Sequence, residues 1–365
     1  MISIKDIVDE IEKFAPTAYQ ESYDNSGLIT GDPETEAKGV LLCFDVTEKI
    51  VDEAICKNLN MIVSHHPVIF YGLKRLTGKT PTERIIIKAV KNDAAIYCAH
   101  TNLDSVSGGI STTLARKLGL EDIKILSPKQ NRLLKLSVFA PCDHAETVRS
   151  AMFAAGAGTI GKYDCCSYNT EGYGTFRAGE GARPFVGTSG EYHREPETLV
   201  QILTERSKLN DVLKAMLSAH PYEVPAYDIF ALENKLENVG LGAVGNLPEA
   251  LSCNEFFDRL KNVLDVKCLR HSHPAKDSIR RVAVCGGSGT ELLSQAVSSG
   301  ADVFVTGNCK YHQFADFARE IISVDAGHFE TECFAVEIFY DLIHKKFPNF
   351  AVCLSEHISN PILYY

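Results

Sequence analysis

The sequence predicts an α/β protein: two similar α/β halves that form one domain with a mostly parallel sheet, and an inserted ferredoxin-like α+β domain. Short apolar strands alternate with amphipathic helices in the first third of the chain, the same alternation returns near the end, and the pattern between them differs. The length of 365 residues also favours two domains over one. We therefore expect one domain over residues 1–130 and 236–365 and the inserted domain over residues 131–235.

The first half alternates helices with strands. Its first helix is indicated by Ile4, Ile7, Val8 and Ile11, which share one helical stripe. Its strands are apolar at every position, which is typical of a parallel sheet that is covered on both faces. The expected helices are 3–14, 47–58, 82–91 and 110–118, and the expected strands are 40–46, 61–64 and 94–99.

The second half repeats this rhythm. Helices are expected to end near Ser299 and Glu320, and a long helix is expected after Asp325. The expected strands are 280–285, 302–306, 321–325 and 351–356. The two halves thus have the same alternation of strands and helices, and we expect them to form one domain.

The middle of the chain predicts the order β-α-β-β-α-β, which suits a small ferredoxin-like sheet with two helices. We expect a strand over LLKLSVFAP, a Gly-rich aromatic stretch over 156–192, and a last strand over AYDIFALE. The expected helices are 144–155, 196–206 and 208–218. The glycines of segment 179–191 follow no phosphate-binding spacing, so turns are favoured there over a ligand loop.

Composition narrows the class of function. With 47 acidic and 37 basic residues the formal charge is −10, which disfavours nucleic acid as a general partner. The acidic residues of the first helix are incompatible with a secretory segment, and the apolar runs are too short to span a membrane, so we expect a cytoplasmic protein. The 12 cysteines include no C-x-x-C pair and are expected to be mostly buried thiols.

Three segments place histidines and acids at strand ends, where ligands bind in open α/β sheets. The first is Ser64-His65-His66-Pro67. Neighbouring side chains on a strand point to opposite faces, so this pair serves one metal poorly, but at the turn before Pro67 it could serve two. The alternative is a pair of histidines that cap the next helix or pack in a loop.

The second segment is His100-Thr101-Asn102-Leu103-Asp104. If the chain stays extended, His100, Asn102 and Asp104 project to one side and present imidazole, amide and carboxylate together. The alternative is that Asp104 is a turn or cap residue.

The third segment is Asp325 to Glu332. His328 and Glu332 are four residues apart, which places them on one face of a helix, and Gly327 permits the sharp turn before it. An acid favoured by the helix dipole would explain Glu332 but not the histidine.

Together these segments supply imidazoles and carboxylates with almost no thiolate. Such a set suits two zinc, iron, manganese or cobalt ions and leaves the choice among them open. Two ions could activate water and polarise a phosphoryl, amidine or carbonyl group, which indicates hydrolytic chemistry. His312 follows another strand end and is a candidate proton carrier, whereas His271 and His273 lie in a polar context typical of a surface loop.

Five motifs together resemble a known family. They are YDNSGL at 23–28, SHHP at 64–67, HTNLD at 100–104, TGNCKYH at 306–312 and DAGHFETE at 325–332. In this order they resemble the NGG-interacting-factor-three-like family, whose bacterial members are labelled GTP cyclohydrolase one, type two, homologues. The inserted segment, with SAHPYEVPAYDIF at 218–230, looks like the PII or CutA-like domain of the longer members.

This resemblance implies a toroidal homohexamer with a dinuclear metal centre facing the interior of the ring, and an insert that caps the openings. His100 becomes an outer or occasional ligand and His312 a neighbour of the site. The implied metal ligands are His65, His66, Asp104, His328 and Glu332, with Asp104 or Glu332 as a bridge. Three positions depart from the family pattern: Tyr23 stands for a frequent Trp, Asn308 for a common Asp and Ala243 for a frequent Arg.

The expected function is a metal-dependent hydrolase with two divalent ions per chain, acting on a small nucleotide-like or phosphorylated substrate, with His312 or His100 moving protons. The alternative is a regulatory or metal-handling ring protein that is not an enzyme and whose PII-like insert senses a metabolite or partner. A coordination position left open to water would favour the enzyme, and closed coordination would favour the regulator.

Overall fold

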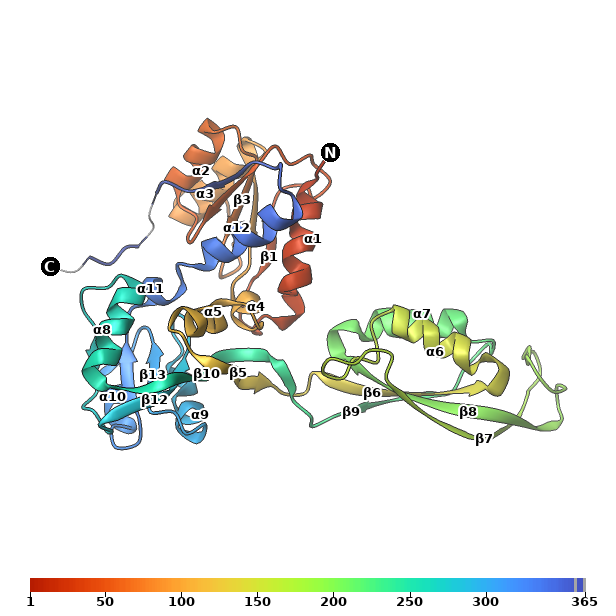
Figure 1. Ribbon diagram of the computed structural model, residues 1–365. Coiled ribbons are helices and arrows are strands. Elements are labelled where there is room, and N and C mark those ends of the chain that lie inside the picture. The colour runs from red at the N-terminus through yellow and green to blue at the C-terminus, as the bar shows by residue number, and fades with distance from the viewer. Residues whose placement is uncertain (358–359, 364–365) are drawn as a thin grey trace. The chain divides into compact units, whose positions relative to one another are not determined.

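The computed structural model describes residues 1–357 and 360–363. The chain divides into two compact units (Figure 1). Met1–Pro128 and Glu237–Tyr365 form the first, called here the core unit, and Lys129–Leu236 form the second, called the insert. The architecture is mixed α/β, as predicted.

The first sheet of the core unit is mostly parallel. In spatial order its strands are β1 (Gly27–Thr30), β4 (Ala95–Cys98), β3 (Met61–Ser64), β2 (Val40–Cys43) and β15 (Val352–Leu354). Only β1 runs antiparallel to its neighbour. Every residue of β2, β3 and β4 is buried, which explains why their sequences are continuously apolar.

Helices cover both faces of this sheet. On one side lie α1 (Ile4–Phe14) and α12 (Ala335–Lys346), which contact each other (Figure 1). On the other side lie α2 (Glu48–Cys56) and α3 (Pro81–Lys91), whose apolar residues pack on Leu41 and Ile62. Helix α1 begins at a capping box, because the hydroxyl of Ser3 accepts from the backbone of Asp6 and the Asp6 carboxylate accepts from Ser3.

The second sheet of the core unit contains six strands. In spatial order they are β11 (Arg270–His271), β14 (Ile322–Asp325), β13 (Val303–Thr306), β12 (Ser278–Val284), β10 (Leu236–Ser252) and β5 (Glu121–Lys129). Strands β12, β13 and β14 are parallel, and β10 and β11 run antiparallel to their neighbours. Helices α8 (Cys253–Leu264), α9 (Leu293–Ser298) and α10 (Tyr311–Asp316) belong to this half, and α5 (Ile110–Lys117) of the first half contacts β12.

The two halves share one hydrophobic core. Strand β15 follows the second half in sequence but pairs with β2 in the first sheet. The long helix expected after Asp325 is two helices, α11 (His328–Glu332) and α12. Because α12 packs on the first sheet and leads into β15, the C-terminal part of the described chain closes the N-terminal half.

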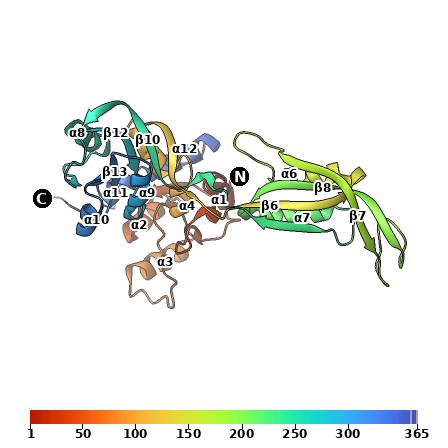
Figure 2. The same cartoon turned by 90° about the horizontal axis from the view of Figure 1, so that it is seen from below.

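The insert has the predicted order β-α-β-β-α-β. Its elements are β6 (Leu133–Pro141), α6 (Ala145–Ala154), β7 (Ser167–Arg177), β8 (Tyr192–Glu205), α7 (Leu209–Ala219) and β9 (Tyr227–Ala231). The sheet order β7-β8-β6-β9 is antiparallel throughout, as in ferredoxin-like folds. Both helices lie on one face of the sheet, and the β7–β8 hairpin extends beyond them (Figures 1 and 2).

One expected helix of the insert is wrong. Residues 196–206 belong mainly to strand β8, which pairs with β6 on one side and β7 on the other. Val200, Ile202 and Thr204 are buried at alternate positions, which is the period of a strand, and their branched side chains favour it. No helix among the described residues is long and apolar enough to cross a membrane.

Candidate metal centre

The three predicted segments meet within the core unit. His65 and His66 follow β3 directly, His100 follows β4, and His328 opens α11 after β14. The backbone amides of His65 and His66 both donate to the carbonyl oxygen of Phe44, which turns the chain sharply after β3. Two neighbouring histidines thereby face one cluster, as the turn before Pro67 predicted.

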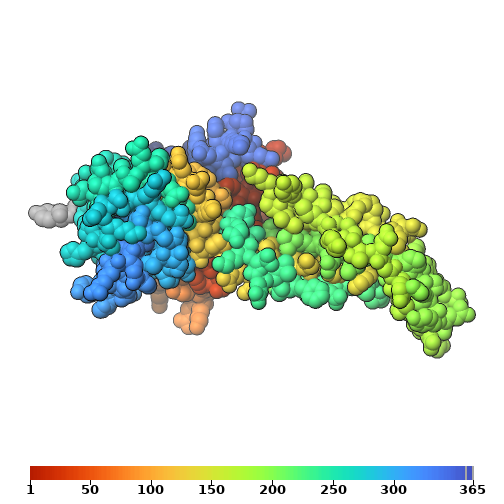
Figure 3. Space-filling model, turned by 60° about the horizontal axis from the view of Figure 1, so that its bottom comes forward, coloured from red at the N-terminus to blue at the C-terminus, as the bar shows by residue number. Residues whose placement is uncertain are grey.

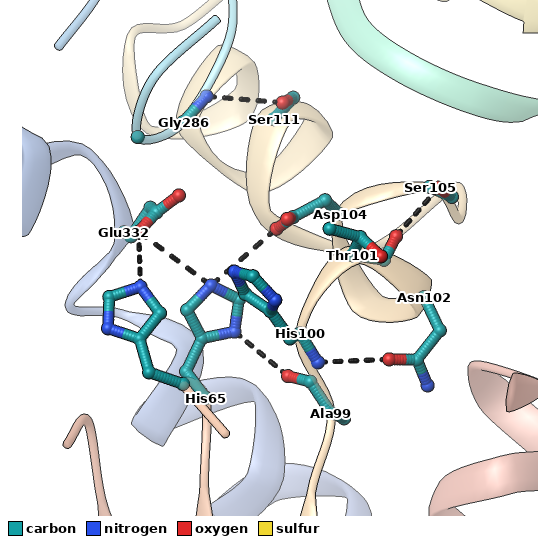
Figure 4. Close-up of polar contacts among 12 residues, drawn as sticks. His65, Ala99, His100, Thr101, Asn102, Asp104, Ser105, Ser111, Gly286 and Glu332 are labelled. Atoms are coloured by element: carbon teal, nitrogen blue, oxygen red, sulfur yellow. Dashed lines mark hydrogen bonds and ion pairs between the residues drawn. The ribbon is translucent and has the colours of Figure 1, made fainter. Parts of the chain in front are cut away.

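The segment after β4 was expected to be extended, but the structure shows a helical turn there. Thr101–Asp104 form the helical turn α4, with His100 as its first flanking residue. The turn points Asn102 away, where its amide donates to the carbonyl of Ala15 at 2.7 Å. Asp104 instead faces His65, with 3.7 Å between Asp104 Oδ1 and His65 Nε2 (Figure 4).

Glu332 lies at the middle of the cluster. Its Oε2 is 3.0 Å from Nε2 of His328, 3.4 Å from Nε2 of His66 and 3.7 Å from Nε2 of His65. The predicted i, i+4 relation between His328 and Glu332 holds because both belong to α11. Figure 4 shows Glu332 and Asp104 reaching the His65 side chain from different elements.

Each imidazole is held by a partner at its other nitrogen. A ring nitrogen fixed in this way directs the opposite nitrogen into the cluster. The Nδ1 contacts are His65 to Ala99 O at 2.9 Å, His66 to Asp45 Oδ1 at 2.7 Å, His100 to Asp24 Oδ1 at 2.7 Å and His328 to Asn308 Nδ2 at 2.9 Å.

The cluster contains buried polar atoms that the protein leaves unsatisfied. In the part of the chain that the structure describes, Nε2 of His65, Oδ1 of Asp104 and Oε2 of Glu332 have no hydrogen-bond partner. Such atoms cost free energy unless something compensates them. Imidazole nitrogens and carboxylate oxygens in this arrangement fit divalent cations.

Three overlapping groups of ligand atoms have the spacing that an ion needs, since the atoms of each group lie within 4.8 Å of one another. They are His65, Asp104 and Glu332; His66, His328 and Glu332; and His65, His66 and His100. Glu332, His65 and His66 each belong to two of these groups, so the groups overlap.

The pKa values of the two buried carboxyl groups shift in opposite directions. Burial raises the pKa of Asp104 well above its usual range, and the nearby charge of Glu332 adds to the rise. Burial acts in the same sense on Glu332, but the imidazoles of His328, His65 and His66 outweigh it and lower its pKa. One carboxyl group of the cluster is therefore held ionised.

The pKa values of His65 and His66 also shift in opposite directions. Burial lowers the pKa of His65. Burial has the same effect on His66, but its contacts with Asp45 and Glu332 outweigh this and raise the pKa of His66 to about 10. Metal binding at His66 therefore competes with a proton.

Two glycines make room for Glu332 and for the turn before α11. A Cβ at Gly287, whose φ is 60°, would lie 1.9 Å from Oε1 of Glu332. Gly327, with φ of 93°, allows the turn into α11, and a Cβ there would meet Glu330. Both positions require glycine for conformation and for space.

Other predicted residues lie elsewhere. His312 is exposed on α10, where its ring contacts Tyr311, and the structure does not bring it into the cluster. His271 is exposed and stacks on Phe257, in keeping with a surface position. The glycine turn after β12 offers little to an anion, because the amides of Gly286, Gly287 and Gly289 donate to the hydroxyls of Ser111, Thr331 and Thr306.

Two acids that the motif analysis did not single out hold the site in place. Asp45 follows β2, so the strand-end rule that found the histidines also points to it. Asp24 lies within YDNSGL and accepts from the hydroxyl of Thr101 at 2.5 Å as well as contacting His100. Burial disfavours its charge, but His100 and Thr101 outweigh burial and hold the pKa of Asp24 below its usual range.

A family model matches almost the whole chain. The model described as Duf34/NIF3 (NGG1p interacting factor 3) covers residues 2–361. A GTP cyclohydrolase 1 type 2 homolog from Halalkalibacterium halodurans is 40% identical over 324 residues, which are 88% of this chain and 87% of the relative. A protein of the same name from Bacillus subtilis is 39% identical over 325 residues, with the same coverage.

Solved structures agree with this match. A Bacillus cereus protein related to NIF3 superposes with a TM-score of 0.83 at 36% identity, covering 100% of this chain and 99% of that one. Staphylococcus aureus protein SA1388 superposes with a TM-score of 0.79 at 26% identity and the same coverage. The resemblance inferred from the five motifs is confirmed.

Proposed function

The chain belongs to the Duf34/NIF3 family, and from this premise we propose that its core unit is a dinuclear metal-dependent hydrolase for a small nucleotide-like or phosphorylated substrate. The observation that supports it most is the convergence of three unsatisfied buried atoms, on His65, Asp104 and Glu332, with the imidazoles of His66 and His328. This set fits two divalent ions of zinc, iron, manganese or cobalt.

In this proposal the five predicted residues would hold the ions, and Glu332 contributes to two of the candidate ligand groups. Two such ions supply Lewis acidity, which activates water and polarises the bond to be broken. The protein's part is to fix the ligands: Asp45 orients His66, and the Ala99 carbonyl orients His65.

Proton transfer is assigned to His100 rather than His312. Asp24 holds Nδ1 of His100, so Nε2 is the atom that exchanges a proton with substrate or water. His100 also belongs to one of the three ligand groups, and the same Nε2 could serve an ion instead. His312 has no described contact with the cluster.

Aromatic rings beside His100 support a nucleotide-like substrate. The Phe70 ring lies 6.3 Å from that of His100 and 6.4 Å from that of Tyr23, between ring centroids. Phe70 and Tyr23 are 36% and 61% exposed, so both offer a face to a planar group. The names of the curated relatives point to the same class of substrate.

The decisive experiment measures bound metals by elemental analysis in the wild-type protein and in His65→Ala, Glu332→Gln and His271→Ala, together with turnover of a nucleotide and phosphoester panel. We expect about two ions per chain, lost in the first two variants together with turnover. His271→Ala removes an exposed histidine and should keep both the bound metal and the turnover.

Other results would change the assignment. Full metal content without turnover on the panel would favour the regulatory alternative, and absence of bound metal would refute the proposal. The homohexamer that the family resemblance implies is part of the same proposal, and sedimentation velocity tests it.

A further inference from the structure

The insert contains a cavity of about 660 Å³. It lies on the sheet face that the helices leave open. Val138 and Val200 pack under α6 and α7, so the adjacent residues Phe139 and Leu199 point to the opposite face, where they line the cavity. The volume is that of a site for a small organic molecule.

Two segments close the cavity over this floor. The aromatic ring of Phe185 lies 6.3 Å from that of Tyr222, between centroids. The backbone amide of Arg183 donates to Oε2 of Glu223 at 3.0 Å, which ties segment 179–191 to the chain after α7. Figure 3 shows the residues around 180–190 in light green at one end of the insert. The predicted turns therefore also form a cavity wall.

One carboxylate faces the cavity from a buried position. Glu197 is 8% exposed and lines the cavity. Its Oε1 accepts a hydrogen bond from the Tyr222 hydroxyl at 2.9 Å, and no hydrogen bond to its Oε2 is present among the described residues. Burial, reinforced by Glu197, raises the pKa of Tyr222, so this hydroxyl remains a donor. The buried Glu197 carboxylate thus receives one hydrogen bond. A donor on a ligand could supply another and offset the free-energy cost of burying the charge.

The charges around the cavity favour a cation. Besides the strand backbone, two acidic residues line it on this side, Glu197 and Glu223, against one basic residue, Arg183. An anionic ligand would meet a net negative wall, whereas a cationic N–H donor gains from it. The apolar remainder, with Phe139, Phe185 and Leu199, favours a flat ring.

We propose that this cavity binds a small molecule that combines a flat apolar ring with a positively charged N–H donor, such as an amidinium or a protonated amine, with the donor on Glu197. Every lining residue belongs to the insert and none to the metal cluster. The site is therefore a second binding site of the chain, and it does not depend on the proposed hydrolase.

Three probes of equal shape test the ligand chemistry on the full-length protein: benzamidinium, benzamide and benzoate, titrated by calorimetry or by NMR. Charge-assisted hydrogen bonds are about twice as strong as neutral ones, so we expect benzamidinium to bind about tenfold more tightly than benzamide and benzoate to bind weakest. Equal affinity for benzamidinium and benzamide, or no saturable benzamidinium binding, would overturn the proposal.

Two variants test the location. Glu197→Gln keeps the shape of the side chain and should weaken benzamidinium binding about tenfold. Glu195→Gln is the matched control, because Glu195 lies on the same strand but pairs with Nε2 of His193 at 2.7 Å and does not line the cavity. An equal loss in both variants would show a nonspecific charge effect and refute the site.

Gly172→Leu fills the space directly. A Cβ at Gly172 has no atom within 4 Å, so the first atom of a new side chain meets open space, and it projects beside Glu197, the partner of Gly172 across β7 and β8. We expect this variant to lose benzamidinium binding while it keeps the thermal stability of the wild type. Retained binding would place the ligand elsewhere, and a changed oligomeric state in sedimentation would identify the cavity as a contact between copies of the chain.

Discussion

The Oδ1 atom of Asp24 lies 2.7 Å from Nδ1 of His100, and the Asp24 side chain is fully buried. This contact fixes the imidazole plane and directs Nε2 of His100 toward His65 and His66. An outer carboxylate of this kind raises the basicity of the imidazole it holds. Asp24 is thus a positioning residue for the candidate centre.

Asp24→Asn should weaken metal binding about 10- to 100-fold, because the amide is a weaker partner for His100. A cobalt titration followed by absorption measures the affinity. Asp32→Asn is the control, since Asp32 is an exposed turn residue. An unchanged affinity in Asp24→Asn would show that His100 is not a metal ligand and would leave it only the proposed proton-transfer role.

Gly287→Ala should abolish one or both metal sites, because its Cβ would collide with Glu332. Gly300→Ala is the matched control: its φ is 76°, but no atom lies within 4 Å of its Cβ. Both variants carry the same backbone cost of about 1–2 kcal/mol, measured by urea unfolding. Metal content lost in both alike would mean that backbone strain alone disturbs the centre.

Asn308→Asp should tighten metal binding by up to about tenfold. In the structure the Nδ2–H of Asn308 donates to Nδ1 of His328, which leaves the ring proton on Nε2, whereas a carboxylate would accept from Nδ1–H and free Nε2 for a metal ion. Competition with a chelator measures the change. Asn308→Ala removes the donor without supplying an acceptor, so its affinity should stay below that of Asn308→Asp, and an equally tight complex in Asn308→Ala would contradict the argument.

The stability that Glu83 contributes should depend on pH. The carboxylate accepts from the amide and hydroxyl of Thr77 and the amide of Lys79, which lowers its pKa from 4.5 to about 2. A lowered pKa in the folded state stabilises the protein above the unfolded value, and this stabilisation is lost as pH falls toward 2.

Glu83→Gln should therefore reduce the urea midpoint at pH 7, and the difference from wild type should shrink below about pH 4.5. Glu48→Gln is the control, because Glu48 forms only a surface ion pair with Arg84. A difference that grows on acidification would contradict the sign of the shift.

Much of the site follows from one rule applied to the sequence, that polar residues at the carboxyl ends of strands converge. It found His65, His66 and His328, and helical spacing added Glu332. The rule also found His100 and Asp104, but the extended conformation expected there is wrong: Thr101–Asp104 form α4, and Asn102 donates to Ala15, which is 87 residues away in sequence. A local sequence pattern does not indicate a hydrogen-bond partner that lies so far away in the chain.

The fold, like the site, was predicted only in part from the sequence. Continuous apolar strands identified the parallel sheets, but the same pattern did not indicate that β15 pairs with β2. In the insert, residues 196–206 were expected to be a helix, but the alternation of Val200, Ile202 and Thr204 and the pairing with β6 and β7 make them part of a strand. Tertiary context decided both cases.

The long separation of the ligands also sets the order of events during biosynthesis. His66 and His328 lie 3.3 Å apart in space but 262 residues apart in the chain. A ribosome that adds roughly 5–20 residues per second needs about 13–50 s to pass from one to the other. During that interval the nascent chain contains His65, His66 and Asp104 without His328 and Glu332, so the complete centre forms only after most of the polypeptide has been synthesised.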